Sequence, residues 1–201
     1  VPHTEHDFEL IFYNADGSEA AMCGNGSRAC AHYAYHEGLA PSKMAFLTGA
    51  GVIHAEVEGD IVDSELTDYI IINEKVEEEG KEWFFADTGV PHLVTEVDDI
   101  TTFDKEICAK VRYAHNGNVN YVSLKEGSLY VRTYERGVED ETLACGTGMA
   151  ACFLKMYRDG KVGDKVKVYP TSKDEISMSI VDGKLHLKGE VNKTFELIKK
   201  I

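Results

Sequence analysis

One short motif occurs twice in this chain of 201 residues, and it constrains the fold more than any other feature. The first copy, CGNGSRAC, occupies residues 23–30 and the second, CGTGMAAC, occupies residues 145–152, so both fit the pattern C-G-x-G-x-x-A-C. Each copy follows a predicted strand that ends in tyrosine and a polar residue, and each begins a predicted helix. Duplication of a half-domain is the simplest explanation, so the chain is predicted to contain two related halves.

The first cysteines of the two copies, Cys23 and Cys145, stand at the predicted N-termini of their helices. Unpaired backbone N–H groups and the positive end of the helix dipole favour the thiolate there, so both positions are expected to lower the thiol pKa. The flanking glycines let backbone amides approach a carboxylate closely. Two such helix starts facing each other predict a two-base site, in which one thiolate removes a proton alpha to a carboxylate and the opposite thiol delivers one.

The rest of the chain is rich in predicted hairpins. An aromatic strand is expected at residues 8–13, and helices are expected at 25–36, 103–114 and 147–157. Further strands are predicted at 51–57, 61–66, 69–76, 82–86, 119–124, 129–134, 165–169, 176–181, 184–188 and 194–198. Direct hairpins with few helices indicate an α+β or mixed α/β fold rather than a doubly wound parallel sheet.

The composition excludes several classes of protein. With 43% hydrophobic and 28% charged residues the chain has the balance of a soluble globular protein. A formal net charge of −14 repels phosphate backbones and anionic lipids, so neither a nucleic-acid nor a membrane partner is expected. No apolar run approaches the ~20 residues of a membrane-spanning helix, and the first residues show no signal-peptide pattern, so a cytoplasmic location is expected.

At several positions a purely structural interpretation competes with a functional one. The five cysteines include no C-x-x-C pair and are expected to be reduced thiols, of which Cys30, Cys108 and Cys152 are interpreted as small apolar fillers. Both motifs also fit G-x-G-x-x-A, but no apolar strand runs directly into either turn, which disfavours dinucleotide binding. His32 and His36 share a helix face without H-E-x-x-H or C-x-x-C, so no metal site is predicted and both are expected to face solvent.

Two further positions suggest chemistry. His92 follows a Gly-Val-Pro segment after an apolar strand, where a predicted loop could carry function. Glu135 and Arg136 come just past a strand end, where the guanidinium could hold a carboxylate through two parallel hydrogen bonds.

Taken together and in this order, the motifs resemble those of the diaminopimelate epimerase family. The resemblance rests on FYNADGSE (12–19), MCGNG (22–26), TGVPH (88–92), NVNYV (118–122), YERG (134–137) and ACGTG (144–148). It implies a cofactor-independent and metal-independent isomerase that interconverts LL- and meso-diaminopimelate in lysine and peptidoglycan precursor synthesis. Cys23 and Cys145 would be the acid/base pair, with His92 assisting the first and Glu135 the second.

The resemblance also implies a substrate site. The distal amino-acid end of the substrate would be held by side chains, and the reacting carboxylate by backbone amides of the two motifs. The residues implied are Asn14, Asn118 and Arg136 for the first group, and Gly24, Asn25, Gly146 and Thr147 for the second, with Glu135 as a further substrate-binding residue.

The fold implied is two pseudo-symmetric halves, each a mixed sheet wrapped around a central helix, with the active site in the cleft between them. We expect residues 1–66 with about 190–201 to form one half and residues 67–189 the other, and a homodimer is a further expectation.

The chain departs from the family at Val90, where members often carry asparagine, and it lacks an upstream Gly-Asn-Asp-Phe motif. A missing first strand pair is therefore expected.

Two alternatives to this function stay open. A related racemase or isomerase that works without pyridoxal phosphate could act on another amino or imino acid. Outside enzymes, the cysteines could belong to a thiol redox module or a metal-binding module.

Overall fold

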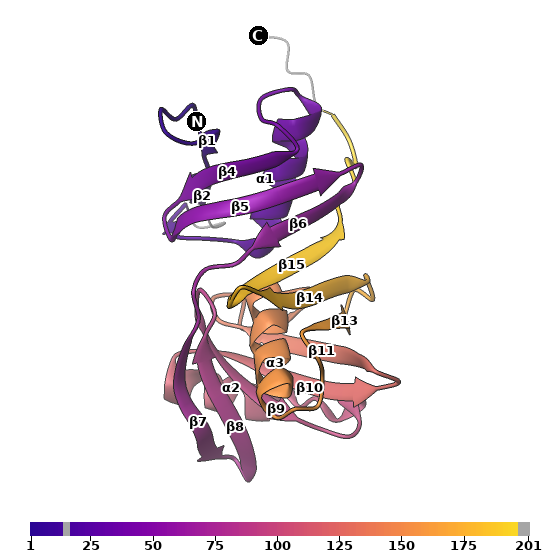
Figure 1. Ribbon diagram of the computed structural model, residues 1–201. Helices are drawn as coiled ribbons and strands as arrows, with labels where there is room; N and C mark the ends of the chain where they lie inside the picture. Colours follow the sequence, from indigo (N-terminus) through magenta and orange to yellow (C-terminus); the bar gives the residue numbers. More distant parts are fainter. Residues whose placement is uncertain (14–16, 197–201) are drawn as a thin grey trace.

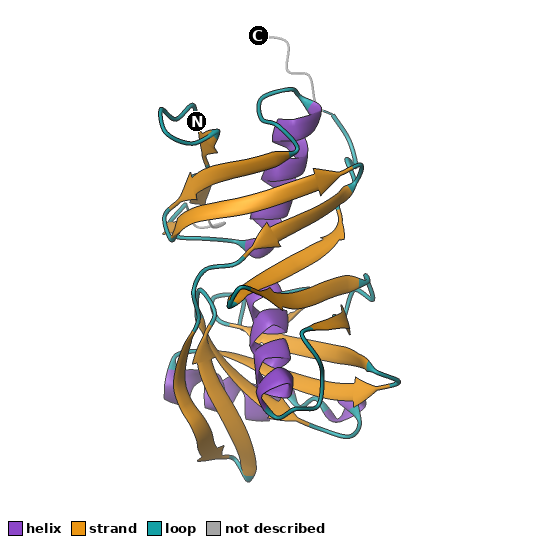
Figure 2. Cartoon of the chain, in the orientation of Figure 1, coloured by secondary structure: helices purple, strands orange, loops and turns teal. Residues whose placement is uncertain are grey.

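The structure, a computed structural model, describes residues 1–13 and 17–196 of the chain. It has two parts stacked along one long axis, each containing one helix from the duplicated motif (Figures 1 and 2). The helices are α1 (Gly24–His36), α2 (Lys105–His115) and α3 (Gly146–Arg158), with a 3-10 turn at Ile100–Thr102. No helix among the described residues is both long and apolar enough to cross a membrane.

Mixed β-structure surrounds α1 and α3. The strands are β1 (Phe8–Glu9), β2 (Phe12–Tyr13), β3 (Glu19–Ala20), β4 (Lys43–Thr48), β5 (Gly51–Glu58), β6 (Ile61–Glu65), β7 (Ile70–Glu78), β8 (Lys81–Asp87), β9 (Pro91–Glu96), β10 (Asn118–Lys125), β11 (Ser128–Glu135), β12 (Asp140–Thr142), β13 (Lys165–Tyr169), β14 (Ile176–Val181) and β15 (Lys184–Glu190). All but β2 and β3 belong to one sheet, and the pairs β1–β4, β9–β10 and β11–β13 are parallel.

The sheet of one part joins the sheet of the other where β6 pairs antiparallel with β15. Leu66 and Leu187 lie at this junction, and both are fully buried. Separate hydrophobic clusters pack around each motif helix. One includes Ala31, Phe46 and Val62 beside α1, whereas a larger one contains most of α3. The mixed α/β architecture with two helix-centred parts is therefore confirmed, while the exact division of the chain at residues 66 and 190 stays a proposal.

The predicted local structure is largely confirmed. All three helices form within two residues of their expected ends, and the hairpins β5–β6, β7–β8, β10–β11 and β14–β15 have the expected partners. The local pattern determines these elements because each hairpin closes through a short turn with a glycine or an acidic residue at positive φ.

Two strand predictions are wrong. The expected strand at residues 8–13 is divided, because Phe8 packs on Phe46 and pairs β1 with β4, whereas the chain then leaves that edge and pairs β2 with β3. The described part of the expected strand at 194–198 forms no strand, and residues 197–198 lie outside the described residues.

His92 lies in strand β9, which corrects its predicted place in a loop. Pro91 is the first residue of that strand, the position where a missing N–H is tolerated. Residues 92–95 are all buried because β9 is covered on both faces, so the strand lacks the alternation that identifies a half-buried strand.

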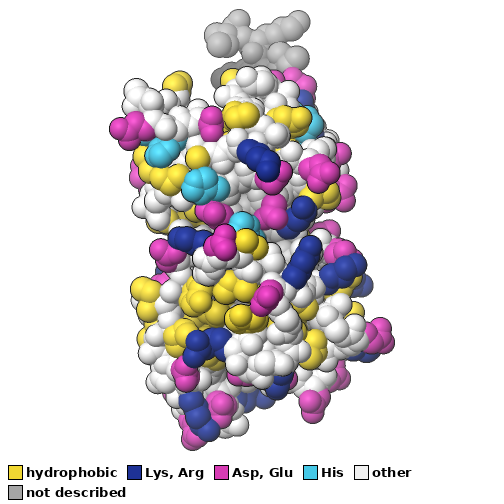
Figure 3. Space-filling model, in the orientation of Figure 1, with side chains coloured by type: hydrophobic (Ala, Val, Ile, Leu, Met, Phe, Trp, Pro, Cys, Tyr) yellow, Lys and Arg dark blue, Asp and Glu magenta, His cyan; other side chains and the backbone are white. Residues whose placement is uncertain are grey.

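Acidic and basic side chains are interspersed over the face displayed in Figure 3. The basic side chains on that face are scattered rather than gathered into one region. This face therefore offers no positive patch of the kind that follows a phosphate backbone.

Candidate active site

The N-termini of α1 and α3 meet at one pocket. A Cβ atom built on Gly24 would lie 3.8 Å from Cα of Gly146, and one built on Gly146 would lie 3.5 Å from Cα of Gly24. Both would also come within 3.2 Å of a methyl group of Leu187. The two glycines thus allow a close approach of the helix starts that larger side chains would prevent.

A pocket of about 440 Å³ opens at this meeting point. It is lined by residues of both motifs and by strand ends from both parts, and these include most of the residues expected at the site. They are Phe12, Glu19, Ala20, Ala21, Met22, Cys23, Gly24, Asn25, Gly89, Val90, Asn118, Glu135, Arg136, Ala144, Cys145, Gly146 and Thr147. Asn14 lies outside the described residues.

Cys23 and Cys145 are the N-cap residues of their helices, with extended backbone at φ −141° and φ −121°. The Sγ atom of Cys23 accepts a hydrogen bond from the amide of Gly26 at 3.4 Å. The Sγ atom of Cys145 lies 3.4 Å from the hydroxyl of Thr147. The cysteines therefore occupy equivalent places on the two helices, as the repeat predicts, and both are half-buried.

The expected lowering of both thiol pKa values is not found at Cys145. Burial raises the pKa of its thiol to about 11, and the negative charge of Glu135 raises it further, while hydrogen bonds from Thr147 and the Gly148 amide oppose the change. Loss of solvation outweighs the helix N-terminus here. Cys145 is therefore a protonated thiol near neutral pH.

The remaining cysteines are separate from this pocket. Cys108 and Cys152 are fully buried, and Cys30 packs against the apolar cluster beside α1. Burial raises the pKa of all three thiols, to about 12 for Cys108. Their surroundings agree with the interpretation that they fill space.

A buried polar network supports the start of α3. Asn120 donates through Nδ2 to the Leu93 carbonyl at 3.0 Å and to Nδ1 of His92 at 3.0 Å. The Nε2 atom of His92 lies 2.8 Å from the hydroxyl of Thr147, and Thr133 donates to Oδ1 of Asn120 at 2.9 Å. The network holds Thr147 beside Cys145.

His92 is neutral at this position. It has no solvent exposure, and burial lowers its pKa to about 3, although the hydrogen bond with Asn120 opposes the shift and the charge of Arg136 adds to it. Its described hydrogen bonds go to Thr147 on α3 and to Asn118 and Asn120 on β10, whereas the resemblance assigns it to Cys23. The role of His92 at Cys23 therefore stays a prediction.

Glu135 and Arg136 lie at the end of β11, next to Asn118 on β10. The carboxamide oxygen of Asn118 accepts a hydrogen bond from the Arg136 amide at 2.7 Å, and the Arg136 guanidinium donates to the Asn116 carbonyl at 2.9 Å. These contacts fix the strand end from which the two charged side chains reach the pocket.

Removing the charge of Glu135 is expected to lower the pKa of the Cys145 thiol. In a Glu135→Gln variant the nearby negative charge that raises this pKa is gone. Mass spectrometry of Cys145 alkylated over a range of pH measures the change, and Glu126→Gln, at the far turn of the same hairpin, is the matched control. An unchanged profile in Glu135→Gln would contradict the electrostatic role of Glu135.

Sequence reasoning missed several residues that shape the site. Asn120 and Thr133 form the network beneath α3, and Arg28 is a buried cation whose guanidinium donates to Oδ1 of Asn25 at 2.9 Å. Desolvation lowers the Arg28 pKa, while Asp174 and Cys23 oppose this shift. The alternation N-V-N in β10 was the sequence signal that could have indicated the network. Polar side chains on one face of a buried strand need hydrogen-bond partners inside the protein.

Comparison with known proteins decides the family. The family model described as diaminopimelate epimerase matches residues 1–69 and 84–194. A diaminopimelate epimerase from Nitratiruptor sp. is 56% identical over 201 residues, which cover 100% of this chain and 80% of the relative. The chain belongs to the diaminopimelate epimerase family. Another diaminopimelate epimerase, from Campylobacter jejuni, is 50% identical over 197 residues, with coverage of 98% and 79%. By its family the chain is an isomerase.

Solved structures show that the fold extends beyond the diaminopimelate epimerases. A hydroxyproline epimerase from Agrobacterium vitis, with bound trans-4-hydroxy-L-proline, matches with a TM-score of 0.68 at 14% identity over 90% of this chain and 67% of that one. A phenazine biosynthesis protein of the PhzF family from Enterococcus faecalis matches with a TM-score of 0.66 at 14% identity, over 90% and 74%. At these identities the match shows a common fold only.

Proposed function

We propose that this chain interconverts LL- and meso-diaminopimelate by inverting one alpha carbon with two cysteines. The observation that carries the proposal is the equivalent placement of Cys23 and Cys145, each the N-cap of a repeated helix and each lining the same pocket. Membership of the diaminopimelate epimerase family supports the substrate.

The proposed reaction moves one proton off the substrate and another onto it. The Cys23 thiolate takes the alpha proton, and the electron pair of the broken C–H bond moves onto the adjacent carboxylate. The Cys145 thiol, which burial keeps protonated, donates its proton to the opposite face of the carbon. Cys23 is then a thiol and Cys145 a thiolate, so the enzyme is ready for the reverse direction.

The charge that builds on the carboxylate needs donors that are already in place. The amides in the first turn of each helix have no carbonyl partner within that helix. Gly24 and Asn25 on α1, with Gly146 and Thr147 on α3, present such amides at the pocket. We infer that they hold the reacting carboxylate and stabilise its developing charge.

The distal end of diaminopimelate carries a second carboxylate and a second amine. We assign it to Asn118 and Arg136 at the ends of β10 and β11, together with Asn14 as the resemblance implies. A guanidinium can bind a carboxylate through two parallel hydrogen bonds. The site therefore selects a substrate that carries a second carboxylate at its distal end.

An Arg136→Lys variant is expected to raise KM by about tenfold or more while kcat changes little. Lysine keeps the charge but cannot form two parallel hydrogen bonds to one carboxylate, and a loss near 1.4 kcal/mol corresponds to a factor of ten. Steady-state kinetics with LL-diaminopimelate measures both constants, and Arg158→Lys on the far end of α3 is the control. Unchanged KM would remove the assigned role of Arg136.

A related epimerase of another amino acid is the second candidate, because Val90 places an apolar side chain in the pocket where family members often carry asparagine. Chiral chromatography after incubation with LL-diaminopimelate, L-lysine and trans-4-hydroxy-L-proline separates the two. Inversion of LL-diaminopimelate alone supports the proposal, whereas preferential inversion of another compound selects the second candidate. We further propose that the protein is located in the cytoplasm and that it forms a homodimer.

A further inference from the structure

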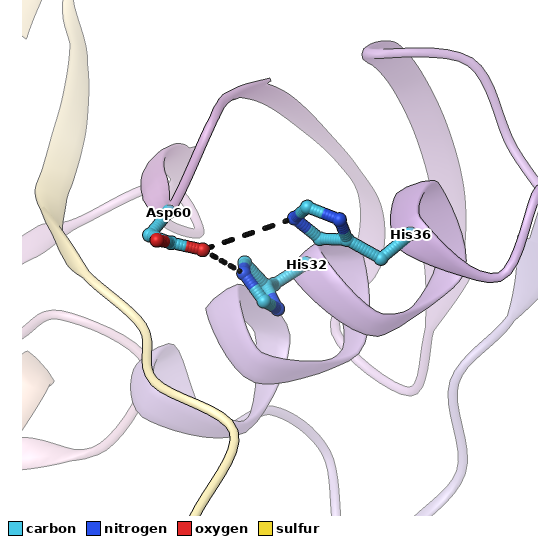
Figure 4. A group of neighbouring side chains, drawn as sticks. All are labelled: His32, His36 and Asp60. Carbon is cyan, nitrogen blue, oxygen red and sulfur yellow. Dashed lines mark hydrogen bonds and ion pairs between the residues drawn. The ribbon is translucent and has the colours of Figure 1, made fainter.

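A cluster of two histidines and one aspartate lies on the surface away from the pocket. His32 and His36 stand one turn apart near the end of α1, and Asp60 comes from the turn between β5 and β6 (Figure 4). The Asp60 carboxylate lies to one side of the two imidazole rings and points toward both. One oxygen of Asp60 is 3.1 Å from Nε2 of His32 and 4.0 Å from Nε2 of His36.

These separations fit the donor spacing of a metal site. Zinc binds imidazole nitrogen and carboxylate oxygen at about 2.0–2.2 Å, which places neighbouring tetrahedral ligands about 3.3 Å apart. The observed 3.1 Å and 4.0 Å bracket that spacing, and the three donor atoms all lie within 4.8 Å of one another. Small side-chain rotations would bring three ligands onto one ion and leave the fourth position to water.

The surrounding structure positions His32 and the Asp60 backbone before an ion arrives. The side chain of His32 is only 12% exposed, so it is packed against the fold, contrary to its expected solvent-facing position, while the side chain of His36 is 44% exposed as predicted. The Asp60 backbone is fixed because its carbonyl accepts a hydrogen bond from the Val191 amide at 2.8 Å. The Asp60 side chain is 62% exposed, which leaves a path from solvent.

We propose that His32, His36 and Asp60 bind a divalent first-row transition ion such as Zn²⁺. Imidazole and carboxylate donors suit such ions, and a histidine pair at i and i+4 projects from one helix face. The ion would tie the end of α1 to the β5–β6 turn. His32 is nine residues along the helix from Cys23, which is about 14 Å, so the ion stabilises the fold and takes no part in the chemistry.

Calorimetric titration of the reduced full chain with Zn²⁺ tests this proposal. We expect one ion per chain, with the affinity lowered at least about tenfold in His36→Ala and in His32→Ala, since each loses one of three ligands. His54→Ala is the matched control, because His54 is an exposed histidine on β5 paired with Glu65 and outside the cluster. Equal Zn²⁺ binding by all four proteins would overturn the site.

A second readout is the melting temperature. At a hundredfold excess of Zn²⁺ over its Kd, the wild type and His54→Ala should melt roughly 5–10 °C higher than without the ion, and His36→Ala should not. Cysteine thiols also bind zinc, so a Cys23→Ser variant is titrated in parallel. Undiminished binding by that variant supports the proposal, and loss of binding there with retention in His36→Ala would contradict it. The test requires no epimerase activity.

Discussion

Replacing Cys145 with alanine is expected to lower the rate of inversion by at least about 10²–10⁴-fold, the usual contribution of one positioned acid or base. The variant retains Cys23 and the carboxylate-binding amides but has no proton donor on the opposite side of the pocket. Cys23→Ala should fall by a similar factor, because the two cysteines occupy equivalent helix N-caps.

The isotope pattern in D₂O separates loss of one base from loss of the whole site. Cys145→Ala should still exchange the alpha proton of one stereoisomer through Cys23 while producing almost no inverted product. Cys30→Ala, which changes a half-buried thiol on the same helix as Cys23, is the control and should keep near-normal turnover. Inversion by both single variants at the wild-type rate would contradict the two-base mechanism.

A Gly148→Ala substitution is expected to destabilise the protein by about 2–5 kcal/mol and to reduce turnover as well. Its Cβ would lie 2.5 Å from Oδ1 of Asn120 and 3.0 Å from the hydroxyl of Thr133, so the buried network beneath α3 must move. Overpacking costs about 1–3 kcal/mol, and a buried polar group left without a partner costs a similar amount. A loss of stability is expected here even though alanine normally stabilises a helix interior relative to glycine.

Urea unfolding of purified variants measures this effect, with Gly163→Ala as the matched control. A Cβ on Gly163 would meet nothing within 4 Å, so that variant should stay within about 0.5 kcal/mol of wild type. If Gly148→Ala proved as stable as Gly163→Ala, the close packing between α3 and Asn120 would be wrong.

The elements that depend on local sequence were predictable. The hairpins follow from alternating strands and turn residues, and the motif helices follow from their N-terminal cysteines and glycines. The repeat also predicted that Cys23 and Cys145 would occupy equivalent positions. Because a duplicated half-domain places its copies in similar surroundings, the sequence could indicate a two-sided pocket without any knowledge of the sheet order.

The features that depend on distant parts of the chain were not predictable. His92 was expected in a loop, but β9 is central and buried on both faces, so it lacks the period-two pattern. The high pKa of Cys145 depends on burial and on Glu135, and neither follows from the motif. The contact of Asn120 with His92 depends on the parallel pairing of β9 with β10, which joins segments separated by α2.

The most direct test of the central claim is proton NMR of LL-diaminopimelate in D₂O with the reduced wild-type chain. The two-cysteine account predicts that the alpha-proton signal disappears while deuterated meso-diaminopimelate appears, because the inverted carbon receives its hydrogen from a thiol that exchanges with solvent. Inverted product that retains the original proton would contradict proton delivery by a second cysteine. Absence of both exchange and inversion, with free thiols confirmed, would contradict the proposed reaction itself.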